Sequence, residues 1–278
     1  MDDTWRAFPE KNPVKLWAEP PGFEPAFGQD EPTVTPYLMG GKGNGCVIVF
    51  PGGGYCMKAM HEAEPVALAM NALGFSSFVL DYRVQPYRWP LPQQDAARAV
   101  RHVRYNAGKY GVNPDKIAVL GFSAGGHLAA CAGVYWDRGD PGSPDPVERV
   151  SSRPDAMILC YPVIRLTGKS RHEGSACNLL GERAVDKDLR LKLTPSLRVS
   201  PESSPAFLWH TADDESVPVG NSMEMFEALR VNGVPAELHV FPKGEHGLGL
   251  AENDPHISKW VGLCGGFLNS LWFPEVLP

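Results

Sequence analysis

Ser123 stands at the centre of the pentapeptide Gly-Phe-Ser-Ala-Gly, residues 121–125. An apolar run over 116–120 comes before it and predicts a strand, and small residues over 127–132 predict a helix after it. In this context a G-x-S-x-G sequence presents a nucleophilic serine at the positive end of a helix. So sharp a turn needs small neighbours, which here are Gly121, Gly125 and Gly126. Because the pentapeptide also arises by chance, the prediction that Ser123 is a nucleophile depends on its partners.

A serine hydroxyl is a weak nucleophile until a base removes its proton, and an acidic side chain must orient that base. On a strand–turn–helix scaffold of this kind, the acid and then the histidine follow the serine along the chain. Asp213 and Asp214 come directly after the strand expected over 206–210, and His246 follows the strand expected over 237–241. We predict that His246 is the base and favour Asp214 as the acid. Asp213 is the alternative, because the two aspartates are adjacent.

Seven other histidines compete for the role of base. Two precede the serine, and four others fit packing, surface or structural positions in or beside the expected strands and helices. His172 differs from them, because it lies in a polar stretch where it could touch a substrate. No metal site is predicted, because His61-Glu62 lacks the second histidine of the motif H-E-x-x-H. The competing histidines are His61, His102, His127, His172, His210, His239 and His256.

A glycine-rich loop, Pro-Gly-Gly-Gly-Tyr at 51–55, follows the strand expected over 46–50. A serine that attacks an ester creates a tetrahedral oxyanion, which backbone N–H groups aimed at that oxygen stabilise. We expect the donors to be the N–H groups of Gly53, Gly54 and Ala124, since Ala124 follows the nucleophile and glycine lets the backbone approach a ligand. The loop could otherwise be a simple turn. It is not a phosphate loop, because neither G-x-x-x-x-G-K-[ST] nor G-x-G-x-x-G occurs.

Apolar runs alternate with helical patterns from residue 46 onward. Short β-branched runs predict strands that are buried on both faces, and apolar residues at helical spacing, such as Ala96, Ala99 and Val103, predict helices. The alternation predicts an α/β fold of one domain over 1–278, with a mostly parallel central sheet and helices on both faces. The expected strands are 46–50, 77–80, 116–120, 156–160, 206–210 and 237–241, and the expected helices are 64–73, 92–110, 127–132, 221–231 and 257–271.

Two parts of the chain depart from this alternation. Residues 1–45 are rich in proline and glycine, and we expect an antiparallel sheet edge there that includes 14–17 and 33–38. Residues 165–205 are polar and have few long apolar runs. A stretch this long without clear strands is more often functional or mobile than plain linker. We therefore expect a short lid-like insertion over the carboxyl ends of the strands.

The composition is that of an ordinary globular chain and excludes several classes of protein. Of 278 residues, 43% are hydrophobic and 21% charged, which excludes a disordered or coiled-coil protein. A net charge of −6 without Lys/Arg-rich runs argues against nucleic acid as a partner, and no apolar run is long enough for a membrane span. The acidic start at 1–6 does not resemble a secretory signal, and the scattered cysteines read mostly as buried free thiols. We therefore expect a cytoplasmic protein, with a homo-oligomer left open.

Together these residues resemble the α/β-hydrolase superfamily and, within it, small bacterial esterases that are acetylxylan esterase-like or carbohydrate esterase-like. The serine and glycine motifs are shared by the whole superfamily. Asn-Leu-Leu-Gly at 178–181 and Trp-His-Thr-Ala-Asp-Asp at 209–214 point more narrowly to the esterases. The likeness extends over about residues 14 to 271. The segments that match are 51–55, 121–129, 161–164, 174–175, 178–181, 209–214, 217–218 and 244–247.

The resemblance implies a serine carboxylic-ester hydrolase that removes acetyl or other small acyl groups from xylo-oligosaccharides or related sugars, with no metal or organic cofactor. Asp214 aligns with the acid of the family. We place a small acyl pocket near Tyr55 and Tyr161, the expected substrate-binding residues. Some relatives are described as xylanases, but no paired carboxylates of a glycosidase are visible. The alternatives are an amidase or peptidase on the same fold and a non-catalytic small-molecule binder, which the loss of one of the three site residues would signal.

Overall fold

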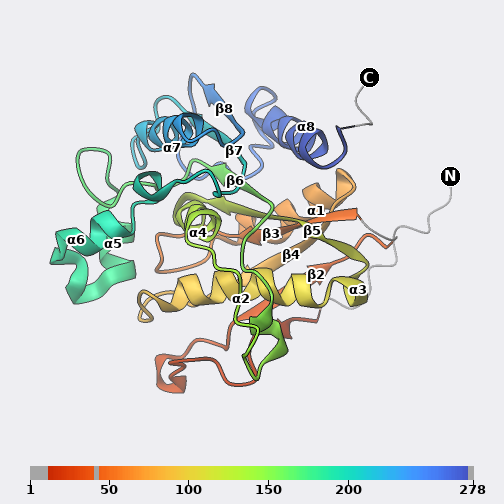
Figure 1. Ribbon diagram of the computed structural model, residues 1–278. Coiled ribbons are helices and arrows are strands. Elements are labelled where there is room, and N and C mark those ends of the chain that lie inside the picture. Colours follow the sequence, from red (N-terminus) through yellow and green to blue (C-terminus); the bar gives the residue numbers. More distant parts are fainter. Residues whose placement is uncertain (1–11, 41–43, 275–278) are drawn as a thin grey trace.

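A single eight-stranded sheet forms the centre of the computed structural model, which describes residues 12–40 and 44–274 (Figure 1). The strands are β1 (Val14–Lys15), β2 (Thr33–Tyr37), β3 (Asn44–Phe50), β4 (Ser76–Asp81), β5 (Val112–Phe122), β6 (Ala156–Cys160), β7 (Ala206–Thr211) and β8 (Ala236–Phe241). Their order is β1-β2-β4-β3-β5-β6-β7-β8. β1 and β2 pair in antiparallel fashion at one edge, and all other neighbours are parallel. The predicted α/β-hydrolase architecture with an antiparallel edge is confirmed.

The helices cover both faces of the sheet (Figure 1). They are α1 (Glu64–Ala72), α2 (Leu91–Tyr105), α3 (Ala107–Tyr110), α4 (Ser123–Val134), α5 (Glu173–Leu180), α6 (Lys187–Lys192), α7 (Gly220–Val231) and α8 (Trp260–Trp272). Alternate residues of β3 belong to different cores. Ile48 and Phe50 pack with α2, α4 and α7, and Val47 and Val49 pack with α1 and α8. Burial on both faces explains why the strand is continuously apolar.

Two of the predicted helices differ from the observed ones in where they begin or are interrupted. The helix expected over 92–110 is interrupted at Asn106, which separates α2 from α3. The side-chain amide of Asn106 donates to the carbonyl of His102 at 2.8 Å, so it competes with the backbone ladder. The helix expected over 257–271 begins as a 3₁₀ turn before α8.

Residues 165–205 contain two helices, α5 and α6, that the sequence pattern did not predict. Both bury leucines in the same core as α4, among them Leu179 and Leu189. Asn178 of α5 donates to the carbonyl of Gly54 at 2.9 Å, in the loop that follows β3. The insertion therefore lies at the carboxyl end of β3, as expected. That it acts as a lid stays a prediction.

Short 3₁₀ helices complete the secondary structure of the described ranges: η2 (Pro25–Phe27), η3 (Met60–Glu62), η4 (Pro146–Arg149), η5 (Gly181–Val185), η6 (Pro195–Arg198) and η7 (Ile257–Lys259). No helix within these ranges is long and apolar enough to cross a membrane. Four of the free cysteines are buried as predicted, but Cys56 and Cys177 are exposed. The acidic start at 1–6 lies outside the described residues.

Candidate active site

Ser123 lies at the junction of β5 and α4 and is 7% exposed. Its φ of +51° is a left-handed conformation that costs a non-glycine residue about 1–3 kcal/mol. A methyl group on Gly121 would come within 2.1 Å of the Gly125 carbonyl oxygen, and one on Gly125 would come equally close to the Phe50 carbonyl oxygen. Only glycine lets the turn close at these two positions. The prediction of a strained serine turn with small neighbours is confirmed.

His246, from the loop after β8, connects Ser123 to Asp214, from the loop after β7. Its Nε2 lies 2.8 Å from the Oγ of Ser123, and its Nδ1 lies 2.6 Å from Oδ2 of Asp214. An ionised carboxylate can only accept, so Nδ1 carries the proton and the unprotonated Nε2 accepts from the serine hydroxyl. The side chain of His246 is 20% exposed, whereas that of Asp214 is fully buried. This geometry allows proton transfer from serine to imidazole.

The two adjacent aspartates face different partners. Burial opposes ionisation of Asp214, but hydrogen bonds from His210, His246 and the Val217 N–H outweigh it and hold its pKa well below the usual range. The exposed Asp213 instead accepts from the N–H of Gly244 at 2.8 Å. The structure therefore brings Asp214, and not Asp213, to the imidazole, and Asp213 ties down the start of the histidine loop.

The glycine loop passes against the serine and leaves two backbone amides free. The carbonyls of Gly52 and Gly53 accept from the N–H groups of Ala59 and Cys56, each at 3.0 Å. A trans peptide places its N–H opposite its C=O, so the N–H groups of Gly53 and Gly54 point away from those donors. Neither amide has a protein acceptor within the described ranges.

The third expected donor is in the first turn of a helix. Ala124 is the second residue of α4, and no side chain caps the start of that helix. Its N–H is therefore one of the amides without an intrahelical partner, at the positive end of the helix dipole. A methyl group on Gly52 would lie 3.1 Å from Cβ of Ser123, so the glycine loop and this turn are in direct contact. Three N–H groups near the serine, those of Gly53, Gly54 and Ala124, therefore have no protein acceptor in the described ranges.

Tyr55 and Tyr161, the predicted substrate-binding residues, are almost fully buried, and that they border an acyl pocket stays a prediction. Each is 1% exposed. The hydroxyl of Tyr55 lies 2.8 Å from Nδ1 of His127, and that of Tyr161 donates to Glu62 at 2.7 Å. Both hydroxyls are therefore committed to protein partners. Tyr161 still borders the site, because its ring meets the ring of His246 edge-on with centroids 5.0 Å apart.

Two of the competing histidines lie near the site. His210 is fully buried, with Nδ1 at 2.8 Å from Oγ of Ser222 and Nε2 at 2.8 Å from the carbonyl of Val217, which fits the structural role predicted for it. His172 caps α5, where its Nδ1 accepts from the N–H of Ser175 at 3.2 Å. Burial and the neighbouring His246 lower the pKa of His172. The insertion thus places an imidazole in electrostatic contact with the base.

Sequence reasoning missed the buried Glu62, which precedes α1 and contacts both the glycine loop and Tyr161. In the sequence it stands only in His61-Glu62, the start of an incomplete metal motif. The described ranges contain no group of three or more His, Cys, Asp or Glu side chains that could hold a metal ion. A glutamate that will be buried has no signature in the sequence, so only its distance of ten residues from the glycine loop could have drawn attention to it.

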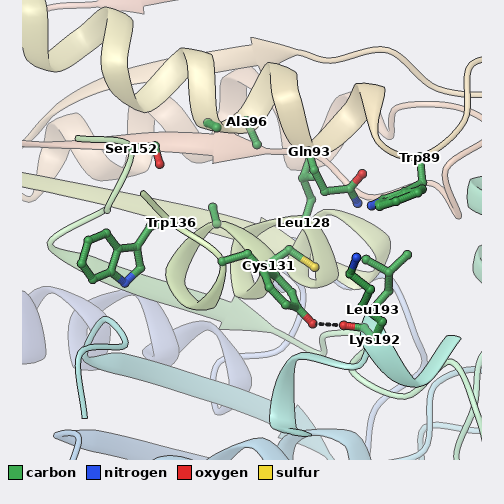
Figure 2. Close-up of a pocket in the computed structure, with 12 residues that line it drawn as sticks. Trp89, Gln93, Ala96, Leu128, Cys131, Trp136, Ser152, Lys192 and Leu193 are labelled. Carbon is green, nitrogen blue, oxygen red and sulfur yellow. Dashed lines mark hydrogen bonds between the residues drawn. The ribbon is translucent and has the colours of Figure 1, made fainter. Parts of the chain in front are cut away.

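A cavity of about 220 Å³ is lined by residues of α2, α4 and the insertion. Figure 2 shows Leu128 and Cys131 of α4 facing Gln93 and Ala96 of α2, with Lys192 at one end of the cavity. Neither the serine, the histidine nor the aspartate lines it. The cavity is therefore separate from the hydrogen-bonded residues Ser123, His246 and Asp214.

Comparison with known proteins places the chain among esterases. Residues 38–229 match the BD-FAE family. The chain is 40% identical over 221 residues to endo-1,4-beta-xylanase B of Butyrivibrio fibrisolvens, covering 78% of this chain and 34% of that protein. It is 31% identical over 234 residues to an acetylxylan esterase of Xylanibacter ruminicola, covering 82% and 46%. The chain thus spans between a third and a half of the length of these curated relatives.

Several solved structures are similar over almost the full length of both chains, and one of them shares about half of its residues with this chain. It is an acetyl ester-xyloside bifunctional hydrolase from Caldicellulosiruptor lactoaceticus. The two sequences are 49% identical, the TM-score is 0.93, and the alignment covers 96% of this chain and 99% of the other. The similarity therefore includes the strand ends and the insertion that surround Ser123.

Proposed function

We propose that this chain, which belongs to the BD-FAE family, is a serine carboxylic-ester hydrolase that removes acetyl or other small acyl groups from sugars such as xylo-oligosaccharides. The observation that carries the proposal is the hydrogen-bonded line from Asp214 through His246 to Ser123. The N–H groups of Gly53, Gly54 and Ala124, which have no protein acceptor in the described ranges, belong to the loop and turn beside these residues. In the proposed reaction these residues supply the nucleophile, the base, the orienting acid and the oxyanion donors.

In the first half of the reaction, Oγ of Ser123 attacks the acyl carbon while its proton passes to Nε2 of His246. The carbonyl oxygen becomes an oxyanion, which the N–H groups of Gly53, Gly54 and Ala124 stabilise. Asp214 keeps the imidazole in the correct tautomer and stabilises its positive charge. When the tetrahedral intermediate collapses, the bond to the sugar oxygen breaks and that oxygen takes the proton from Nε2. The acyl group stays on the serine.

In the second half, a water molecule replaces the sugar. Nε2 of His246 takes a proton from the water, whose oxygen attacks the acyl carbon and forms a second oxyanion beside the same N–H groups. Collapse of this intermediate breaks the bond to Oγ of Ser123, which recovers its proton from the imidazole. The products are the free carboxylic acid and the resting enzyme. No metal or organic cofactor enters any step.

The substrate class rests on the relatives rather than on the triad. An acetylxylan esterase and an acetyl ester-xyloside hydrolase are among the proteins that this chain resembles over most of its length. Cleavage of the xylan backbone is not proposed, because the chain covers only 34% of the relative that is named a xylanase. We assign residues 165–205 to the rim that faces the sugar, since this insertion carries His172 and contacts the glycine loop.

The other two functions find less support. A non-catalytic binder would not need the strained serine turn, yet Ser123 keeps its left-handed backbone and both of its partners are in place. An amidase or peptidase would use the same residues, so only substrate preference separates it from an esterase. No observation favours amide cleavage, and an acetylxylan esterase and an acetyl ester-xyloside bifunctional hydrolase are among the relatives.

Acetate release from acetylated xylo-oligosaccharides tests the proposal. We expect wild-type enzyme to release acetate and Ser123→Ala to lose activity by at least about 1,000-fold. Ser270→Ala is the matched control, because Ser270 is an exposed serine on α8 that bonds only within its helix. Unchanged turnover by Ser123→Ala would refute the assignment of the nucleophile. A wild-type enzyme that cleaves a peptide amide faster than the acetyl esters would refute the substrate class.

A further inference from the structure

Near the serine lies a buried carboxylate that the reaction described above does not use, that of Glu62 at the end of η3. We propose that Glu62 is a positioning residue for the esterase reaction, whose carboxylate holds the glycine loop and the loop that carries His246 in fixed positions relative to each other. The inference rests on the proposed function, because it assigns no separate activity to the chain.

Both carboxylate oxygens of Glu62 accept hydrogen bonds from parts of the site. Glu62 is 2% exposed. Its Oε2 accepts from the N–H of Gly52 at 2.7 Å, and its Oε1 accepts from the hydroxyl of Tyr161 at 2.7 Å. Gly52 directly precedes Gly53 and Gly54, the proposed oxyanion donors. The carboxylate therefore fixes the position from which the glycine loop approaches the serine.

Tyr161 extends the network to the base. Its hydroxyl accepts from the N–H of Gly249 at 2.7 Å, three residues after His246. The ring of Tyr161 also meets the imidazole edge-on. Beside it, His61 donates from Nε2 to the carbonyl of Gly247 at 2.8 Å. The pair of residues that ends η3 therefore holds the histidine loop at two points.

The hydrogen-bond pattern assigns a negative charge to Glu62. The N–H of Gly52 can only donate, and the hydroxyl of Tyr161, which already accepts from Gly249, has its proton free for the carboxylate. Both oxygens of Glu62 therefore accept, as an ionised carboxylate does. Burial raises the pKa of Glu62 above its usual value, and the hydrogen bonds from Tyr161 and Gly52 offset only part of that rise.

The charge of Glu62 has no lysine or arginine partner in the described ranges. Its neighbours that can take a positive charge are histidines: Nε2 of His61 lies 3.8 Å from Oε1, and His246 interacts with the carboxylate electrostatically. When His246 takes the serine proton, its positive charge therefore forms within the field of two buried carboxylates, Asp214 and Glu62. This field favours the imidazolium that exists in the transition state.

Glu62→Gln tests the inference, because it keeps the side-chain shape and removes the charge. We expect kcat for 4-nitrophenyl acetate to fall about 10- to 100-fold with KM within about threefold of wild type. Glu245→Gln is the matched control: Glu245 precedes His246 in the chain but is exposed to solvent. We expect it to change kcat less than about twofold, since solvent screens an exposed charge.

A pH profile separates the charge of Glu62 from a purely structural role. The titratable groups around His246 are Asp214, Glu62, Tyr161 and His172. Only Glu62 changes in Glu62→Gln. Without its negative charge the imidazolium is less favoured, so the acidic limb of kcat/KM should move to lower pH by about half a unit. A residue that only supports the fold would leave this limb in place.

Tyr161→Phe completes a double-mutant cycle with Glu62→Gln, because it removes the bridging hydroxyl and keeps the ring. If the two residues act through one network, the double variant should lose little more activity than the worse single variant. Losses that multiply would overturn the inference, as would a kcat for Glu62→Gln within twofold of wild type. If Glu62→Gln does not fold, as judged by circular dichroism, a Tyr161→Phe kcat within twofold of wild type overturns it. Wild-type enzyme without esterase activity would instead refute the proposed function.

Discussion

Two pairs of an imidazole and a hydroxyl each include one residue of α4, and they differ in the third group that the imidazole contacts. In the first pair, Nε2 of His246 lies 2.8 Å from the hydroxyl of Ser123. In the second, Nδ1 of His127 lies 2.8 Å from the hydroxyl of Tyr55. The distances are the same. The other nitrogen of His246 faces the carboxylate of Asp214, whereas that of His127 donates to the carbonyl of Leu193 at 2.8 Å.

The second pair shows that hydrogen-bond geometry alone does not make a proton relay. Burial lowers the pKa of His127 to about 4, and burial raises the pKa of Tyr55 well above its ordinary value. Both groups therefore stay neutral at pH 7, and no anion is in place to stabilise an imidazolium. The pair instead joins the glycine loop to the end of the insertion. A carboxylate and a ring open to solvent distinguish His246.

The largest expected effect comes from replacing the histidine of each pair and comparing the losses of activity. His246→Ala should lower kcat for 4-nitrophenyl acetate by about 10,000-fold, because no other base among the residues that the structure describes bonds to the serine hydroxyl. His127→Gln should lower it less than about threefold, because His127 contacts neither the serine nor the base. Steady-state kinetics of both variants check this prediction. Similar losses in the two would break the distinction between a relay and a structural pair.

A smaller but still large effect should separate the two aspartates. Asp214→Asn replaces the acceptor on Nδ1 of His246 by an amide that can favour the wrong tautomer, and kcat should fall by about 1,000-fold or more. Asp213→Asn keeps an oxygen that can accept from Gly244 and should reduce kcat less than about tenfold. Parallel measurement of kcat provides the check. The reverse order would mean that the acid has been misassigned.

The smallest effect concerns stability, and it belongs to the buried pair. The folded pKa of His127, about 4, lies below the ordinary value of 6.5, so on acidification the unfolded chain binds the proton first. The contribution of neutral His127 to the free energy of unfolding is complete above about pH 6.5. It is lost as the pH falls toward about 4, by up to about 1.4 kcal/mol per pH unit. His102, whose pKa burial also lowers to about 4, adds to the loss.

Urea unfolding at pH 7 and pH 5 measures the contribution of the buried histidine. His127→Gln should lose less of its unfolding free energy between the two pH values than wild type does, because glutamine does not titrate. His239→Gln serves as a control, since the half-buried His239 lies at the far edge of the sheet from α4. An equal loss of free energy in wild type and His127→Gln would show that His127 is not responsible.

The sequence predicts those features of the site that local patterns encode. Ser123 follows a continuous apolar run and His246 follows the alternating segment 237–241, so both side chains could be placed at the carboxyl ends of parallel strands. The choice between Asp213 and Asp214 depends on the course of a turn that no residue pattern specifies. The burial of Glu62 and of the two tyrosines likewise depends on packing between segments that are distant in the chain.

The insertion shows the same limit for secondary structure. Its helices are short, and Leu189 is the only residue that α6 buries, so α6 has no apolar stripe from which the sequence could predict it. The one local signal is Asp186, whose side chain caps the helix by accepting from the N–H of Leu189 at 3.0 Å. Both helices bury leucines in the core that contains α4, and α5 also bonds to the glycine loop. The sequence pattern of 165–205 contains none of these distant partners.

The most direct test of the account is to trap the acyl-enzyme. Wild-type enzyme is mixed with 4-nitrophenyl acetate, quenched with acid during the first turnover and digested, and the peptides are analysed by mass spectrometry. The account predicts one acetyl group on the peptide that contains Ser123, and none in the same peptide of His246→Ala, which lacks the base. Turnover by wild type with the acetyl group on a different side chain would contradict the account.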